Sequence, residues 1–191
     1  MGSEICIRDR ILFDPIFSER ASPLKFAGPK RLVEPAIKIS SLPKTDVIVI
    51  SHNHYDHLDI QSIKKIQKKY PDVKILIPKG DGKLLKKHNI RNFNEFLWWD
   101  NIKIKDTTFT FTPSQHWSAR GLSDRNKSLW GSWHTNYNQK NIFHAGDTGY
   151  SNDFKEIKKR LGDVDFAMIP IGAYSPNWFM GYSHVNPEEA V

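Results

Sequence analysis

The chain has 191 residues, enough for one domain with a sizeable core, and its ordinary apolar share argues against disorder. Its one cysteine, Cys6, excludes an internal disulfide framework, and no apolar run is long enough for a membrane span or a signal peptide. The net charge of +7 fits a solvated lysine-rich surface or, as an alternative, attraction to anionic lipid or nucleic acid. We therefore expect a cytoplasmic protein that can attach peripherally to anionic membrane.

Short apolar runs that alternate with amphipathic segments predict an α/β domain with a mixed sheet. The expected strands, in chain order, are residues 5–7 and 11–13 as a hairpin, 37–39, 47–50, 73–77, 96–99, 102–105, 109–112, a strand holding Trp130 and Trp133 as core residues, a strand through His144, and a buried strand at 165–171. The expected helices follow Asp59, lie within residues 80–89, and span residues 153–161. The three strands between residues 96 and 112 are expected to be antiparallel neighbours.

A dense set of metal-ligand side chains follows the strand at residues 47–50. Residues 51–59 read Ser-His-Asn-His-Tyr-Asp-His-Leu-Asp, and Asp59 is the predicted N-cap of the helix that follows. The segment therefore leaves the carboxyl end of a buried strand, which is where open α/β sheets place their functional sites.

The spacing of these side chains favours two metal ions over a histidine-rich surface loop. His52 and His54 point the same way in an extended loop, while Asp56 and His57 come after the turn. Four ligands within six positions exceed what one tetrahedral ion takes from a single loop.

Two later strand ends carry further candidate ligands. His116 follows the strand at residues 109–112 and is a candidate metal ligand, although a lone histidine is more often an ordinary surface or packed residue. Asp147 projects from a glycine-flanked turn, where its two carboxylate oxygens can bridge two cations or it can simply form the turn. His144 is expected to be a packed strand residue.

Three features near the end of the chain remain open from spacing alone. The apolar residues 178–180 can close the core or line a lipid-facing cleft. His184 can be a packing residue, a metal ligand or a substrate contact. Asn186, Pro187 and Glu188 begin a helix that has no body before Val191, so we expect the domain to lack its C-terminal part.

The loop at residues 51–57 resembles the His-x-His-x-Asp-His signature of the metallo-β-lactamase superfamily, whose fold is an αββα sandwich. Other segments are similar to the N-acyl-phosphatidylethanolamine-hydrolysing phospholipase D family, namely residues 14–18, 112–117, 129–133, 145–150 and 169–174. The resemblance implies a single metallo-β-lactamase-like domain over residues 1–191 that lacks its C-terminal part.

The resemblance also implies roles for particular residues. One zinc ion would be held by His52, His54 and His116, the other by Asp56 and His57, and Asp147 would bridge them. This assigns Asp56 and Asp147 to catalysis and Tyr55 and His184 to the substrate phosphate region. The family has a further histidine ligand in a His-Trp-Gly segment, which this sequence does not contain, and residues 1–6 stand in place of its usual first strand.

The activity implied is zinc-dependent hydrolysis of N-acyl-phosphatidylethanolamine to N-acylethanolamine and phosphatidic acid. In such a site two zinc ions activate a water molecule and stabilise negative charge in the transition state. One alternative is a related lactonase or hydrolase of small anionic sugar phosphates. A non-enzyme alternative is nucleic-acid binding, which we do not expect because the sequence lacks a recognised motif and a clustered basic stripe with stacking aromatics.

Overall fold

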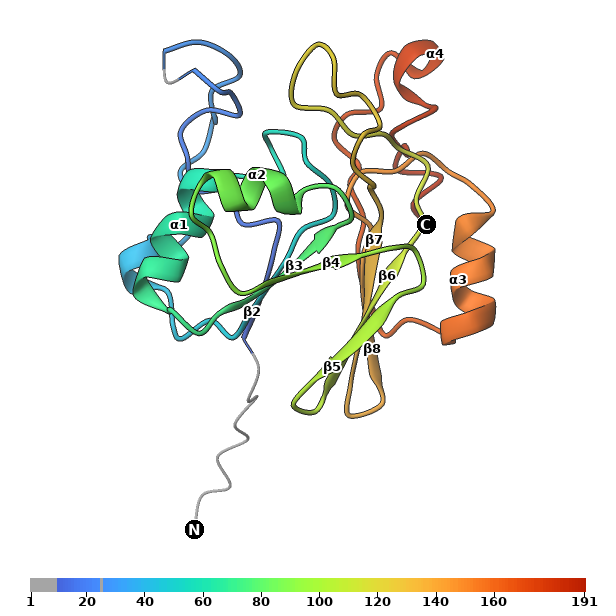
Figure 1. Cartoon of the computed structure of the whole chain (residues 1–191). Coiled ribbons are helices and arrows are strands. Elements are labelled where there is room, and N and C mark those ends of the chain that lie inside the picture. The colour runs from blue at the N-terminus through green and yellow to red at the C-terminus, as the bar shows by residue number, and fades with distance from the viewer. Residues whose placement is uncertain (1–9, 25) are drawn as a thin grey trace.

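The computed structural model describes residues 10–24 and 26–191 and shows two β-sheets packed face to face between helices. Helices α1 (Ile60–Lys69) and α2 (Gly82–Lys87) cover the outer face of one sheet. Helix α3 (Asp153–Leu161) covers the outer face of the other (Figure 1). The predicted αββα sandwich is confirmed.

The first sheet has four parallel strands in sequence order. They are β1 (Ile11–Phe13), β2 (Val47–Val49), β3 (Lys74–Pro78) and β4 (Phe93–Phe96). Strand β2 is fully buried, as expected for a β-branched run in a parallel sheet with both faces covered. Because the strands are parallel, their carboxyl ends meet at one edge of the sheet.

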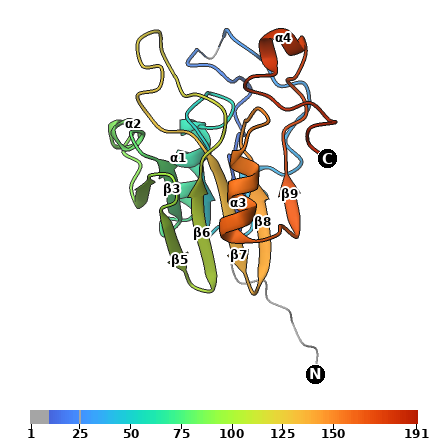
Figure 2. The ribbon, with the colours of Figure 1, turned by 90° about the vertical axis from the view of Figure 1, so that its right-hand side faces the viewer.

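The second sheet has five strands in sequence order, and only the last pair is parallel. They are β5 (Asn101–Ile104), β6 (Thr107–Thr112), β7 (Ser132–Tyr137), β8 (Lys140–His144) and β9 (Phe166–Met168). The turns that join β5 to β6 and β7 to β8 lie at one end of the molecule (Figures 1 and 2). Strands β6 and β8 run from that end toward the other.

The alternation of side chains along the strands produces three apolar layers. The layer between the sheets contains Val47, Val49, Leu76, Phe96, Phe109, Phe111 and Trp133. The next residues along β2 and β3 face the other way and pack against Ile63 and Ile66 of α1. A smaller layer joins Phe143 of β8 to Ile157 of α3.

Helix α1 follows the metal-ligand loop and is held at both ends. The Asp59 carboxylate accepts from the backbone N–H groups of Gln61 (3.0 Å) and Ser62 (3.3 Å), which confirms its prediction as N-cap. The helix ends at Lys69, and its C-cap residue Tyr70 stands directly before Pro71.

Several predicted strands differ from the structure. Residues 37–39 are not a strand, because a 3-10 helix, η1, occupies Ile39–Ser41. Strand β4 ends at Phe96 and pairs in parallel with β3, so the strand expected at residues 96–99 is wrong in position and partner. Residues 5–7, the expected hairpin partner of β1, lie outside the described residues, and β1 pairs in parallel with β2.

The aromatic residues divide between core and surface differently from the prediction. Trp133 is fully buried, but Trp130 lies before β7 begins. The expected buried strand at residues 165–171 is short, and Phe166 of β9 is 60% exposed at the sheet edge. Helix α4 (Asn177–Met180) leaves Trp178 87% exposed, so this apolar run does not close the core.

The helix start predicted near the C-terminus forms one turn. The Asn186 side chain accepts from the Glu189 backbone N–H (2.8 Å), and the Glu189 carboxylate accepts from the Asn186 backbone N–H (3.0 Å). These reciprocal bonds are a capping box. Within the described residues no helix is both long and apolar enough to cross a bilayer.

Candidate metal centre

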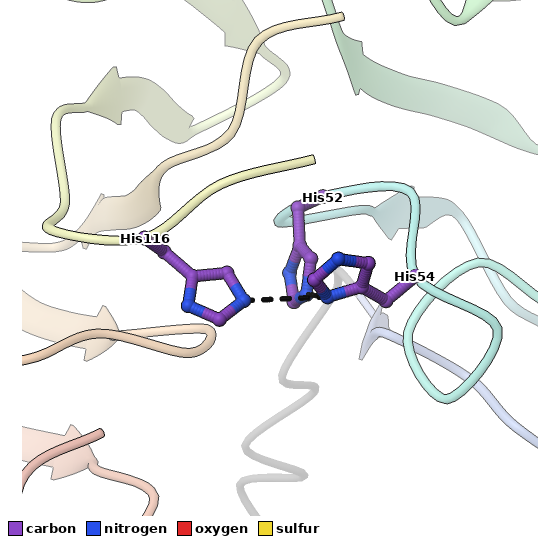
Figure 3. A group of neighbouring side chains, drawn as sticks. All are labelled: His52, His54 and His116. Atoms are coloured by element: carbon purple, nitrogen blue, oxygen red, sulfur yellow. Dashed lines mark hydrogen bonds between the residues drawn. The ribbon is translucent and has the colours of Figure 1, made fainter. Parts of the chain in front are cut away.

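The predicted ligands come together from both sheets at the carboxyl ends of their strands. Strand β2 leads into the loop with His52 and His54, β6 leads to His116, and β8 leads to Asp147. Three histidine rings converge from two of these loops, with His116 facing the other two (Figure 3). Two groups of ligand atoms result, and in each group the atoms lie within 4.8 Å of one another.

The first group consists of three imidazoles. His54 Nδ1 lies 2.9 Å from His52 Nε2 and 3.3 Å from His116 Nε2. His52 and His116 are almost completely buried. These are the three residues that the resemblance assigns to the first zinc ion, and the structure brings them together.

Neighbouring groups decide which nitrogen of two rings carries the hydrogen. The Ser183 carbonyl can only accept, so His116 Nδ1 donates to it (3.2 Å) and Nε2 keeps its lone pair. The Ser51 hydroxyl donates to Asp14 (2.5 Å), so it accepts from His52 Nδ1 (2.9 Å). His52 Nε2 therefore also presents a lone pair to the group.

The same three histidines are held neutral. Burial lowers the pKa of His116 to about 3, lowers the pKa of His52 well below its usual range, and lowers that of His54. Neutral imidazole is the form that binds a metal ion. Two lone pairs, on His52 Nε2 and His116 Nε2, thus converge beside the neutral ring of His54, so the residues fit a divalent metal ion.

The second group joins His52 to His57 and Asp147. His57 Nε2 lies 3.3 Å from Asp147 Oδ2, and His57 Nδ1 lies 2.7 Å from Asp14 Oδ2. Burial opposes a charge on His57, but the hydrogen bonds and charges of Asp14 and Asp147 outweigh it and raise the pKa of His57 well above its usual range. The metal-free protein therefore holds a proton here that a metal ion must displace.

Asp147 belongs to the second group and also lies close to the first. Its Oδ2 atom is 3.3 Å from His57 Nε2 and 3.9 Å from His116 Nε2. Burial raises the pKa of Asp147, but the hydrogen bond and charge of His57 outweigh burial and leave that pKa at about 2. The anionic carboxylate lies within 4 Å of a histidine of each group, and its role as a bridge between two ions stays a prediction.

Glycine allows the turn that carries Asp147 to approach the metal loop. Gly146 has a φ of +60°, and a Cβ atom there would lie 2.5 Å from Ser51 Cβ. A larger residue at position 146 would therefore clash with the metal loop. His144, at the end of β8, packs on Phe13 as expected, with 5.1 Å between ring centroids.

Asp14 is a functional candidate to which the sequence analysis gave no role. It follows β1, and its side chain, 7% exposed, accepts from the Ser51 backbone N–H (2.7 Å), the Ser51 hydroxyl and His57. Its φ of +40° is one that aspartate tolerates better than most residues. The sequence does show an acidic residue directly after a predicted strand. It does not show that this strand pairs with β2, which is what brings Asp14 to the metal loop.

Asp56 is the one predicted ligand that belongs to neither group. Its side chain is 62% exposed, and its Oδ2 atom lies 3.9 Å from His57 Nε2. The carboxylate is near the second group but faces solvent, and its role as a ligand stays a prediction.

The two predicted substrate contacts have different neighbours. His184 Nδ1 is 3.9 Å from Asp147 Oδ2, and the His184 ring lies 5.3 Å from that of His116. The Tyr55 hydroxyl donates to the Arg120 carbonyl (3.1 Å). His184 thus borders the metal groups, whereas Tyr55 contacts the loop between β6 and β7.

A model of the family described as "Beta-lactamase superfamily domain" matches residues 9–191. The chain belongs to this superfamily. The superfamily assignment agrees with the two-sheet architecture and with the ligand cluster at the strand ends. It confirms the resemblance drawn from the metal-ligand loop.

Two superfamily proteins of assigned activity are similar over most of the chain. N-acyl-phosphatidylethanolamine-hydrolyzing phospholipase D 1 of Caenorhabditis elegans is 40% identical over 95% of this chain and 54% of its own length. The mitochondrial enzyme of the same name from Saccharomyces cerevisiae is 40% identical over 95% of this chain and 40% of its own length. The chain spans about half the length of the curated relatives it matches.

Solved structures share the fold at lower identity. An isothiocyanate hydrolase from Delia radicum gut bacteria has a TM-score of 0.72 at 20% identity, covering 94% of this chain and 71% of that protein. At this identity the likeness concerns the fold alone.

Proposed function

We propose that the protein is a zinc-dependent phosphodiesterase of the phospholipase D type that hydrolyses N-acyl-phosphatidylethanolamine. The observation that carries the proposal is the pair of ligand groups, which share His52 and meet at Asp147, in a chain 40% identical to two enzymes named for this reaction. Imidazole nitrogens and carboxylate oxygens are ligands that zinc takes.

The proposed reaction is the addition of water to the phosphodiester. Two zinc ions in the site would activate a water molecule near neutral pH and stabilise the charge that develops on the phosphate oxygens. The water oxygen joins phosphorus, and the bond from phosphorus to the ethanolamine oxygen breaks. That oxygen takes a proton, so the products are N-acylethanolamine and phosphatidic acid.

The chain's own residues supply the positioning. His52, His54 and His116 would hold one ion, and His57 and Asp56 the other, with Asp147 between them. His184 borders Asp147, with 3.9 Å between its Nδ1 atom and Asp147 Oδ2, and would contact the substrate phosphate beside that carboxylate.

Exposed apolar side chains support a lipid substrate. Three segments carry a group of them that includes Leu24, Phe26, Leu122, Trp178, Phe179 and Tyr182, and others, such as Leu97 and Val164, lie elsewhere. The three segments are residues 20–24 and 26–33, the loop 118–127 and the region of α4, and they lie at the end of the molecule opposite the β5–β6 and β7–β8 turns (Figures 1 and 2). The metal groups lie toward the same end, because β6 and β8 lead to it.

We propose that this apolar end contacts the surface of an anionic membrane, with the protein otherwise in the cytoplasm. Amphipathic aromatic side chains favour the boundary between lipid and water, and the net charge of +7 adds attraction to anionic headgroups. Such a contact would present the lipid phosphodiester to the metal centre.

The test is a substrate comparison on the zinc-loaded protein. Vesicles of N-acyl-phosphatidylethanolamine, a lactone and a sugar phosphate are incubated in parallel, and the products are identified by mass spectrometry. The proposal predicts N-acylethanolamine and phosphatidic acid in equal amounts from the lipid. Binding of two zinc ions with intact lipid and an opened lactone would show that the reaction is wrong although the metal site is right.

A further inference from the structure

Arg120 holds the metal-ligand loop closed from the side that carries no ligand. Its Nη1 atom donates to the backbone carbonyls of Asn53 (2.8 Å) and Leu58 (2.8 Å). These two carbonyls stand on either side of the turn that carries His54 and His57. One guanidinium nitrogen therefore fixes the distance between the two ends of that turn.

A second contact holds the same side of the loop. In the extended segment His52 and His54 face the metal group, so Asn53 between them faces the other way. The Asn53 side-chain amide donates to Asp81 Oδ1 (2.9 Å), and both residues are buried. The ligand histidines are thus backed by contacts to two segments that contribute no ligand.

Arg120 and Tyr55 also hold each other directly. The guanidinium carbon lies 3.9 Å from the centroid of the Tyr55 ring, and the Tyr55 hydroxyl donates to the Arg120 carbonyl (3.1 Å). Tyr55 is the central residue of the loop between the ligands. Its ring and its hydroxyl are both oriented by one residue of another loop.

Hydrogen bonds within the loop 118–127 fix the backbone at Arg120. The Asp124 carboxylate accepts from the backbone N–H groups of Arg120 (3.1 Å) and Gly121 (2.8 Å). The Asn126 backbone N–H donates to the Ser118 carbonyl (2.8 Å) and closes the base of the loop. Arg120 therefore reaches the metal loop from a fixed backbone.

We propose that Arg120 is a positioning residue of the metal centre, which holds the two ends of the ligand turn at the separation that metal binding requires. The inference rests on the metal binding of the proposed function and not on its substrate. Groups that orient metal ligands from outside the coordination shell typically change metal affinity about 10–100-fold when they are altered.

The test compares metal binding by Arg120→Met and Arg120→Lys with that of the wild-type protein. The zinc dissociation constant is measured by competition with a chelating dye, and the visible spectrum of the cobalt-substituted protein reports ligand geometry. Arg120→Met should raise the dissociation constant at least about tenfold and alter the cobalt spectrum. Arg120→Lys, which keeps the charge without the planar group, should lie between.

Arg160→Met is the matched control. Arg160 also lies over an aromatic ring, that of Trp99 (4.1 Å), but it pairs with Glu156 on α3 and does not contact the metal loop. The substitution Arg160→Met removes the same charge and the same kind of ring contact as Arg120→Met. Because Arg160 lies away from the metal loop, the dissociation constant and the cobalt spectrum should stay unchanged.

Folded Arg120→Met with wild-type affinity and spectrum would overturn the inference. If Arg120→Met does not fold, the zinc affinities of Arg120→Lys and Asp124→Ala test the inference instead. Asp124→Ala loosens only the loop that carries Arg120. Wild-type affinity in both variants would overturn the inference. Failure of the wild-type protein to bind zinc would instead contradict the proposed function.

Discussion

At the scale of single residues, one carboxylate controls the protonation of two ligands. Asp14 accepts the Ser51 hydroxyl hydrogen, which makes Ser51 accept from His52, and it accepts directly from His57. The Asp14 side chain thus determines both the lone pair on His52 Nε2 and the proton on His57. The positions involved are separated by 37 and 43 residues from Asp14, so the strand pairing β1 to β2 is what creates the arrangement.

Asp14→Asn should weaken metal binding. The amide keeps the size of the side chain but removes the charge that holds His57, so affinity at the second group should fall roughly 10–100-fold. Competition with a chelator measures it. Asp46→Asn is the control, because this carboxylate accepts from the Arg10 backbone N–H (3.2 Å) and Lys105 (2.8 Å) at the opposite end of β2. Equal affinities of the two variants would contradict the role assigned to Asp14.

Metal binding at the second group should depend on pH above the usual pKa of histidine. The pKa of His57 is raised well above 6.5, so at pH 7 the metal-free protein carries a proton there that the ion displaces. Apparent affinity should therefore rise with pH from 6.5 to the raised pKa and then level off. Affinity at His52, His54 and His116, which are already neutral, should stay constant over that window.

Calorimetric titration in buffers of different ionisation enthalpy measures this proton release. About one proton should leave per ion bound at the second group at pH 7. A His57→Asn variant should release none there. Proton release that is unchanged in this variant would show that the displaced proton lies elsewhere.

At the scale of elements, helix α1 anchors the far end of the metal loop. Asp59 caps the helix and also accepts from the Ser18 backbone N–H (3.0 Å), so one side chain joins the helix to the segment after β1. Its position before an apolar run at helical spacing made the cap predictable. The bond to Ser18 was not predictable, because it joins residues 41 positions apart.

Asp59→Ala should lower the free energy of unfolding by about 1–2 kcal/mol, the usual cost of losing a capping oxygen. Urea denaturation followed by circular dichroism measures it. Asn152→Ala is the matched control, because the N-cap side chain of α3 makes no capping bond and should change stability by only a few tenths. A loss for Asp59→Ala no larger than that of the control would contradict the capping role.

For two of the strands that were predicted wrongly, the position and the neighbours are determined by tertiary packing. The local sequence of residues 93–96 does not show whether this strand pairs with β3 or with β5. Its place in the parallel sheet follows from the core between β3 and α2. Strand β9 reads as a buried strand, but it lies at an edge of its sheet, where Phe166 is exposed.

At the scale of the whole molecule, the apolar end and the metal groups lie at the same end of the sandwich. Trp178 and Phe179 belong to a helix of four residues, too short to bury a face of its own. Their exposure is a property of the assembled fold, since the sequence allowed core packing equally well.

Replacing Trp178 and Phe179 with serine should lower binding to anionic vesicles at least about 100-fold, because burying each of the two side chains in lipid contributes roughly 1.5–3 kcal/mol and about 1.4 kcal/mol is a factor of ten. Cosedimentation at low and high salt measures it, and the remaining electrostatic attraction should weaken as salt is added. Val164→Ser is the control, since Val164 is exposed before the amino end of β9, away from the metal groups. Unchanged binding of the double variant would contradict the proposed membrane contact.

The sequence by itself determined the ligand types, the strand that precedes them and the helix that follows them, because these depend on spacing within about twenty residues. Only the tertiary structure decided that Asp14 and Arg120 hold the metal loop, that Asp56 faces solvent and that Trp178 is exposed. The physical reason is that strand pairing and loop packing bring together groups that are distant in the chain, and local spacing carries no information about which distant groups will meet.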